Sequence, residues 1–130
     1  MSIETQRKIH FIIEGEPASK SNSRKIVKFG NRPALIKSDK ARNYEKIFAQ
    51  QCPILDNPLE SDVKVELIIY YASRRPDLDE SVVLDCMQGK IYVNDRQVKQ
   101  KYIYWGLDRD RPRTHVRVSP LESCDLPSDF

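Results

Sequence analysis

Hydrophobic and polar residues alternate in several short segments of this chain, and the alternation predicts strands. The clearest segment is residues 63–71, where Val63, Val65, Leu67 and Ile69 share one face. Side chains of a strand point alternately to its two faces, so this pattern is typical of a strand with one buried face. Similar segments occur at residues 8–15, 91–93, 98–105 and 114–118.

Turn and capping residues predict a hairpin and two helices between these strands. Residues 26–29 and 32–36 flank Gly30-Asn31, a typical two-residue hairpin turn. Ser38 can cap a helix that continues to Gln51 and ends before Pro53. A shorter helix is predicted over residues 80–88, with Asp79 as its N-cap and Gly89 after its last turn.

These elements predict a small α+β domain with a mixed β-sheet and two main helices. We expect residues 1–118 to form the domain, because 130 residues are enough for one hydrophobic core. Residues 119–130 are rich in Pro, Ser and Asp, and we expect a flexible tail there.

Composition points to a cytoplasmic protein. The three cysteines, Cys52, Cys86 and Cys124, are odd in number and lack C-x-x-C spacing, which argues against a disulfide framework or a zinc knuckle and favours a reducing compartment. The polar N-terminus is not followed by an apolar stretch long enough for a signal peptide or a membrane span. We therefore expect a soluble protein without membrane association.

The net charge of +3 is unevenly distributed along the chain. Residues 1–55 contain eleven Lys or Arg and five Asp or Glu, whereas residues 56–130 contain eleven and fourteen. Charged faces are often merely solvated, but a basic surface beside a group of carboxylates favours a metal-dependent nuclease, which needs both phosphate contacts and metal ligands. The candidate phosphate contacts are Lys20, Arg24, Lys25, Arg74 and Arg75.

Residues 74–98 carry the candidate chemistry. Asp77 and Asp79 follow the best strand, and residues two apart in an extended segment point the same way. Two carboxylates roughly 5 Å apart repel by about 3 kcal/mol at an effective dielectric of about 20, so a third acid, Asp95, needs a cation if it joins them. Oxygen ligands favour Mg²⁺ or Mn²⁺. Taken alone, an Asp-x-Asp pair is more often structural, because turns and N-caps use Asp.

A longer motif runs through the same part of the chain. The strand is followed by Arg75-Pro76-Asp77-Leu78-Asp79, a helix with Leu84-Asp85, then Gly89-Lys90-Ile91-Tyr92 and Asn94-Asp95-Arg96-Gln97-Val98. In this order the motifs resemble the RusA family of Holliday junction resolvases of bacteria, phages and prophages. The N-terminal third resembles the family more loosely, through a first strand, a basic loop with Pro17 and a helix with Tyr44-Glu45.

The resemblance implies a RusA-like fold and a homodimeric endonuclease that uses Mg²⁺, with Mn²⁺ able to substitute. Its substrate would be a four-way junction or other branched DNA, nicked in a symmetric pair during recombination or repair in the bacterial cytoplasm. The family's catalytic and metal-binding acids correspond here to Asp77, Asp79 and Asp95.

The chain also departs from the family pattern. Glu80 stands where an Asn is usual, the helix lacks the usual Lys, and Asn94 replaces an acid. We therefore expect slow cleavage. Lys90 or Lys20 is a candidate to supply the positive charge of the missing helix Lys. Glu80, Asp85 and Lys90 are candidates for a supporting layer around the acids, and Asp85 is equally a helix-surface or interface residue. The alternatives are a branched-DNA binding protein of the same fold with weak or no cleavage, and a small phage interaction protein with a solvated basic face.

Overall fold

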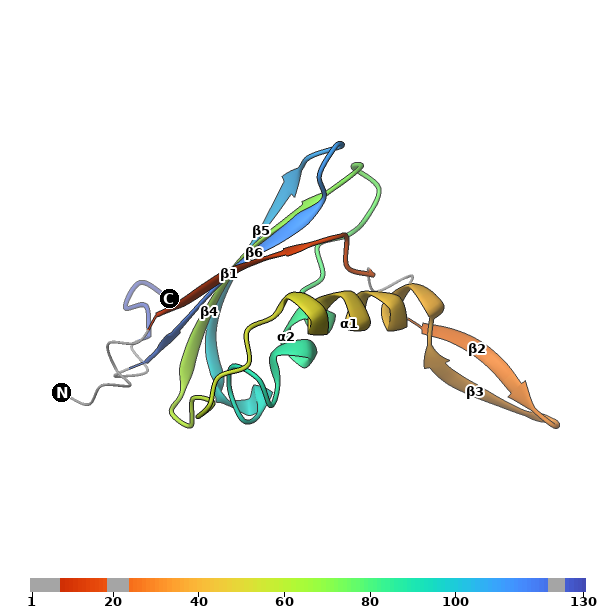
Figure 1. Cartoon of the computed structure of the whole chain (residues 1–130), viewed down its shortest axis with the longest axis horizontal. Coiled ribbons are helices and arrows are strands. Elements are labelled where there is room, and N and C mark those ends of the chain that lie inside the picture. Colours follow the sequence, from red (N-terminus) through yellow and green to blue (C-terminus); the bar gives the residue numbers. More distant parts are fainter. Residues whose placement is uncertain (1–7, 19–23, 122–125) are drawn as a thin grey trace.

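The computed structural model describes residues 8–18, 24–121 and 126–130. Four strands form the main sheet in the order β1-β6-β4-β5 (Figure 1). β4 pairs with β5 in parallel and with β6 antiparallel, so the predicted mixed sheet is confirmed. The elements are β1 (Ile9–Glu14), β2 (Arg24–Phe29), β3 (Arg32–Lys37), α1 (Asp39–Gln51), β4 (Val63–Tyr71), α2 (Ser81–Met87), the 3₁₀ helix η3 (Asp95–Gln97), β5 (Val98–Leu107) and β6 (Arg113–Pro120).

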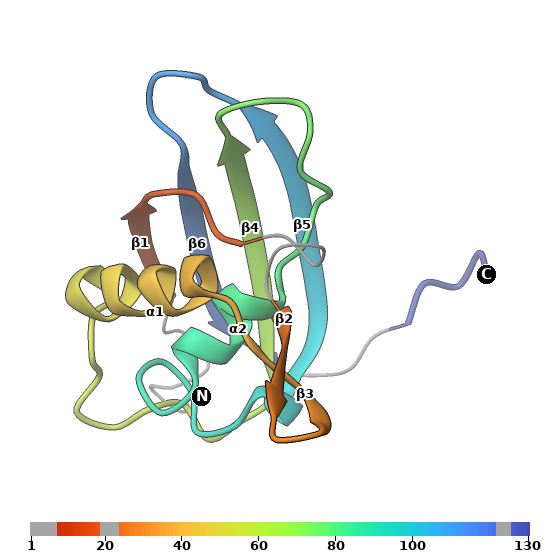
Figure 2. The same cartoon turned by 90° about the vertical axis from the view of Figure 1, so that its right-hand side faces the viewer.

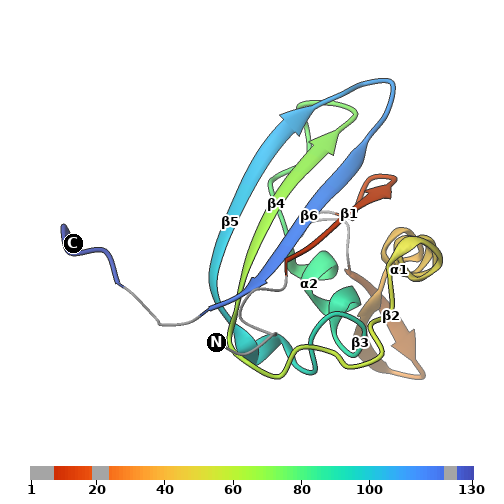
Figure 3. The ribbon, with the colours of Figure 1, turned by 60° about the vertical axis from the view of Figure 1, so that its left-hand side comes forward.

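Both α-helices lie on one face of the main sheet (Figures 2 and 3). β4 directs alternate side chains to this face, and all of these are fully buried: Val63, Val65, Leu67, Ile69 and Tyr71. Phe48 of α1 and Met87 of α2 are also fully buried in the resulting core. The opposite face of the sheet carries exposed apolar side chains, including Ile68, Tyr102 and Tyr104.

The parallel pairing of β4 with β5 determines where the acidic segment lies. A parallel pair needs a crossover connection, and here residues 72–97 with α2 and η3 form it. The chain therefore leaves the C-terminal end of β4, passes through Asp77 and Asp79, and enters α2 on the helical face of the sheet.

Several local predictions are confirmed. The hairpin forms with Gly30 at φ +64° in its turn, and α1 begins after Ser38, whose Oγ accepts the Ala41 N–H at 3.2 Å. Gly89 follows the end of α2 with φ +81°, the left-handed conformation that favours glycine.

Two local predictions differ from the structure. Glu80, not Asp79, holds the N-cap position of α2, and its side chain makes no capping hydrogen bond. The predicted strand at residues 91–93 is wrong, because Tyr92 makes only isolated bridges with Leu59 and Gln88. Residues 91–93 are apolar because Ile91 and Tyr92 are buried next to the loop that contains Leu59.

The described ranges contain no helix that is long and apolar enough to cross a membrane. Cys52 and Cys86 are free thiols, and Cys124 lies outside the described residues.

Candidate functional site

The loop that carries Asp77 and Asp79 is held by the last residue of β4. The buried Tyr71 hydroxyl donates to the Asp77 carbonyl oxygen at 3.2 Å and accepts the Asp79 N–H at 3.3 Å. Burial raises the pKa of Tyr71, and the nearby carboxylates of Asp79, Glu16 and Glu80 raise it further, so the hydroxyl keeps its proton.

Neighbouring strands and loops support the same segment. The Trp105 ring stacks on Tyr71 with centroids 6.1 Å apart, and its Nε1 donates to the Pro76 carbonyl at 3.4 Å. The Glu16 carboxylate accepts the Ala72 N–H at 2.9 Å and pairs with Lys40 of α1 at 3.3 Å. Side chains from β4, β5 and the loop after β1 thus fix the path of this segment, and Lys40 holds Glu16.

Asp79 is a buried carboxylate, with 4% of its surface exposed. Its Oδ1 accepts the Ser81 N–H at 3.0 Å and also the Ser81 hydroxyl. The side chain borders a cavity of about 40 Å³, enough for a small ion or a water molecule. We call this cavity the acidic pocket; it is lined by Ala18, Lys37, Ala41, Glu45, Asp79, Ser81, Val82 and Asp85.

Asp77 and Asp95 take other positions. Asp77 is exposed in the loop before α2. The Asp95 N–H donates to Gln88 Oε1 at 3.0 Å, just beyond the C-terminal end of α2, whereas Asp79 contacts the first residue of that helix. Seven helical residues span about 10 Å, so Asp79 and Asp95 lie at opposite ends of α2.

The motif around Asp95 has a clear structural role. Asn94 caps η3 by accepting the Arg96 N–H at 2.9 Å, and Gln97 Oε1 accepts the Asn94 N–H at 2.8 Å. The Gln97 amide also donates to the carbonyls of Leu59 and Ser61 at 2.7 and 2.8 Å. These bonds fix η3 against the loop before β4 and leave the Asp95 side chain exposed.

Within the described ranges, no three His, Cys, Asp or Glu side chains gather closely enough to hold a metal ion. The structure brings Asp79 to one pocket with Asp85 and Glu45, and it does not bring Asp95 to that pocket. The metal-binding roles of Asp77, Asp79 and Asp95 stay predictions.

A wider cavity adjoins the acidic pocket. It has a volume of about 490 Å³, and we call it the basic groove; its lining residues are Lys37, Arg42, Glu45, Lys46, Ala49, Asp85, Cys86 and Lys90. Lys37, Glu45 and Asp85 line both cavities, which are therefore direct neighbours. Lys37 pairs with Glu45 at 2.5 Å, and Lys90 Nζ donates to the Cys86 carbonyl at 3.3 Å.

Sequence reasoning did not single out Lys37, Arg42, Lys46 or Glu45 as site residues. A signal was present in α1, because Arg42, Glu45, Lys46 and Ala49 follow the three- and four-residue spacing of one helix face. Nothing in the sequence indicated that this face borders Asp85 of α2.

The predicted phosphate contacts are only partly described. Lys20 lies outside the described residues, and Arg24 is described only as part of β2. Lys25 is exposed and pairs with Asp39 at 3.4 Å. Arg74 and Arg75 are exposed on the loop that carries Asp77, and their DNA contacts stay predictions.

The Glu80 side chain pairs with Lys101 of β5 at 2.6 Å. This ion pair gives Glu80 a partner outside the acidic pocket. Partial burial opposes its ionisation, but the hydrogen bond and charge of Lys101 outweigh the burial and lower the pKa of Glu80.

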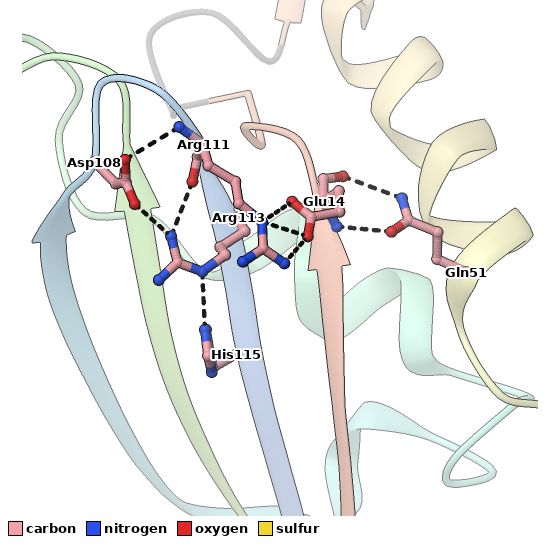
Figure 4. Close-up of polar contacts among 6 residues, drawn as sticks. All are labelled: Glu14, Gln51, Asp108, Arg111, Arg113 and His115. Carbon is pink, nitrogen blue, oxygen red and sulfur yellow. Dashed lines mark hydrogen bonds and ion pairs between the residues drawn. The ribbon is translucent and has the colours of Figure 1, made fainter.

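A second polar cluster stabilises the same end of the sheet, where β1, β4 and β5 end and β6 begins (Figure 4). Arg111 makes two-pronged contacts with Glu14, and Arg113 Nη1 donates to Asp108 Oδ2 at 2.7 Å. Gln51 of α1 bonds to both the N–H and the carbonyl of Glu14. These bonds join the β5–β6 turn to β1 and α1, and we assign the cluster a structural role.

The acidic pocket and the basic groove together are typical of a protein that binds phosphates. Carboxylates beside several cations, held on a small mixed α+β domain, suit a protein that acts on the phosphate backbone of nucleic acid. Residues 14–119 match the model of a family described as endodeoxyribonuclease RusA. The chain belongs to this family, and the resemblance seen in its motifs is confirmed. Endonucleases of the family generally depend on a divalent metal ion.

Similarity to a curated protein covers a smaller region. A thymidylate kinase of Mycoplasma mobile is 32% identical over 81 residues, which cover 62% of this chain and 36% of that protein. The chain therefore spans little more than a third of the length of this relative. The G-x-x-x-x-G-K-S/T phosphate loop of nucleotide kinases does not occur in the 130 residues, so we base the function on the family match.

Proposed function

We propose that this chain is a magnesium-dependent endonuclease that resolves four-way DNA junctions by paired symmetric nicks. The observation that carries the proposal is that the acidic pocket, with buried Asp79, and the basic groove, with four Lys or Arg side chains, lie side by side and share three lining residues. A phosphate of the DNA strand that follows the groove can thereby approach the carboxylates.

The oxygen atoms of the carboxylates near Asp79 are suitable ligands for a hard cation. Carboxylate oxygens are the ligands that Mg²⁺ and Mn²⁺ prefer, and among the described hydrogen bonds Ser81 uses only Oδ1 of Asp79. A bound Mg²⁺ would lower the pKa of a coordinated water and neutralise charge on the phosphate. We propose Asp77 and Asp79 as ligands. The third ligand is either Asp95, as the family motif implies, or Asp85, which lines the same pocket as Asp79, whereas Asp95 lies at the other end of α2.

The remaining groups of the site bind and orient. Lys37, Arg42, Lys46 and Lys90 would contact successive phosphates along the groove, which positions DNA without reading its sequence. Tyr71 keeps Asp77 and Asp79 in place through its two hydrogen bonds. Selectivity for branched DNA would then come from the shape of the junction.

We further propose that the active unit is a homodimer, because symmetric incision of a two-fold junction needs two sites related by a two-fold axis. The open face of the sheet supports this, since β4 and β5 expose Ile68, Tyr102 and Tyr104 there. Tyr104→Lys is expected to give a 15 kDa monomer in sedimentation, whereas the wild type sediments as a dimer. A monomeric wild type with and without junction DNA would contradict the proposal.

Cleavage is tested with a labelled four-way junction and a linear duplex of the same arm sequences, in Mg²⁺ and in EDTA. We expect paired nicks in the junction only, only with the metal, and none with Asp79→Asn. Retention of the junction without nicks would instead favour a branched-DNA binding protein. The absence of any basic residue in α2 favours this second function. No retention at low salt would contradict both.

The identity of the third ligand is tested with Fe²⁺ in place of Mg²⁺, since radicals formed at bound iron cleave the protein backbone nearby. Cuts near residue 95 that disappear in Asp95→Asn support Asp95, and cuts near residue 85 that disappear in Asp85→Asn support Asp85. The two variants are matched, because each removes one charge and retains the side-chain shape.

A further inference from the structure

The hairpin of β2 and β3 is separate from the main sheet. It forms its own two-stranded sheet and extends beyond the N-terminal end of α1, away from the other strands (Figure 1). Gly30, at φ +64°, takes the first position of its two-residue turn, and Asn31 does not have positive φ, as in a tight type II′ turn. The turn gives the arm a narrow tip.

Large apolar side chains on this arm face solvent. Ile26, Phe29 and Leu35 are 73%, 67% and 66% exposed. Phe29 is the last residue of β2, directly before the turn, so an aromatic ring lies at the tip. Apolar groups that gather on an exposed element are typical of an interaction surface.

The arm is also strongly basic. Residues 24–37 contain five Lys or Arg and no Asp or Glu. Near its base, Lys25 pairs with Asp39 and Lys37 pairs with Glu45. Lys28 and Arg32, which flank the tip, make no ion pair with any residue that the structure describes.

The pairing register decides which kind of partner fits. Lys28 lies opposite Pro33, and Phe29 lies opposite Arg32, so each face of the tip carries one cation beside one apolar ring. A hairpin that packs on a protein surface is expected to have one apolar and one polar face. Cations beside apolar rings on both faces instead match nucleic acid, where phosphates flank the flat faces of bases.

We infer that the β2–β3 hairpin is a DNA-recognition arm whose Phe29 ring stacks on an unstacked base at the branch point, while Lys28 and Arg32 contact the flanking phosphates. A branch point offers base faces that a continuous duplex keeps stacked, and aromatic side chains stack on bases without regard to sequence. The inference rests on the proposed DNA substrate, but it concerns selective binding and is independent of cleavage.

The test measures binding of the full chain to a four-way junction and to a linear duplex of the same arm sequences, in EDTA to prevent cleavage. Phe29→Ala is expected to weaken junction binding about 5- to 150-fold, the range that corresponds to base–aromatic stacking, with less than about a twofold change for the duplex. Phe29→Trp should retain junction binding. Lys28→Ala with Arg32→Ala should weaken binding to both and flatten the slope of log K against log salt by up to about 1.8.

Ile54→Ala is the matched control, because Ile54 is 69% exposed in the loop after α1, outside the arm. It should bind both DNAs as the wild type does, and thermal unfolding should show that all variants remain folded. If Phe29→Ala binds the junction as tightly as the wild type, or loses the same affinity for junction and duplex, the inference is overturned and the proposed function stays intact. A change of sedimenting mass in Phe29→Ala would show that the arm docks on a second copy and would also overturn it. A wild type that neither binds nor cuts the junction would overturn the proposed function and this inference together.

Discussion

The hydroxyl of Tyr71 accepts the backbone N–H of Asp79, 3.3 Å away. This bond joins the last residue of the central strand β4 to the buried carboxylate residue of the acidic pocket. Because the same hydroxyl donates to the Asp77 carbonyl, one side chain fixes the backbone of both residues of the Asp-x-Asp motif.

Tyr71→Phe should therefore disturb the loop without removing a charge. The Asp79 N–H would be left buried without this acceptor, so the free energy of unfolding should fall by about 1–3 kcal/mol in urea. Cleavage should slow more than junction binding weakens, because the carboxylates lose their fixed position. Ile54→Val is the control, since the Ile54 side chain is exposed in the loop after α1. A Tyr71→Phe variant with wild-type stability and cleavage would show that the bond contributes nothing.

Asp77→Asn, Asp79→Asn and Asp95→Asn should each abolish cleavage while junction binding stays intact or tightens slightly. Each change removes a proposed metal ligand and a negative charge that repels phosphate. Junction cleavage and binding in EDTA are measured side by side, with the exposed Asp56→Asn as the control. If all three variants cut at the wild-type rate, the assignment of the site is wrong.

Lys37→Ala should lower the cleavage rate at saturating protein by about 10- to 150-fold. Lys37 lines both the acidic pocket and the basic groove, and losing one charge-assisted contact of about 1.5–3 kcal/mol corresponds to this range. Lys90→Ala should have a smaller effect, because Lys90 lines the groove but not the pocket. Lys99→Ala, exposed on β5 and outside both cavities, serves as the control, and equal rates for all three variants would remove Lys37 from the site.

Gly106→Ala should destabilise the fold. A Cβ at this position would lie 2.6 Å from Cδ1 of Tyr70, and the guanidinium of Arg113 lies 4.1 Å from the centroid of the same ring. The ring has little freedom to move, so we expect a loss of about 1–3 kcal/mol in urea unfolding. The same substitution in a Tyr70→Ala background should cost much less, and an equal cost there would contradict the steric explanation.

Stability should fall below neutral pH because of His115. Partial burial lowers the pKa of His115, and the positive charges of Arg113 and His10 lower it further, while its neutral Nε2 accepts the Arg113 Nε–H at 3.0 Å. With the folded-state pKa below the unfolded value of about 6.5, protonation favours the unfolded chain. The contribution is therefore complete well above pH 6.5 and is lost as the pH falls below about 6.5 towards the lower folded-state pKa. Urea unfolding between pH 8 and 5 should show a steeper decline for the wild type than for His115→Gln, and parallel curves would contradict this.

The sequence by itself determined the local elements and the family. The alternation over residues 63–71 appears in the structure as a strand whose one face is fully buried, because a side-chain period of two leaves no other way to bury that face. Ser38 predicted the start of α1, Gly30 predicted the hairpin turn and Gly89 predicted the end of α2, because caps and turns depend only on neighbouring residues. The Asp-x-Asp motif and its surroundings indicated the family that residues 14–119 match.

Only the tertiary structure decided which distant groups meet. The strand order β1-β6-β4-β5 and the crossover through α2 place Asp79 and Asp95 at opposite ends of one helix, which spacing along the chain could not show. The packing of α1 beside α2 brings Glu45 of α1, and Lys37 at the end of β3, to the pocket of Asp79 and Asp85. The apolar residues 91–93 had the composition of a strand, but burial under the Leu59 loop left them only isolated bridges. Such contacts depend on how complete elements pack together, and a local pattern of residues does not encode that packing.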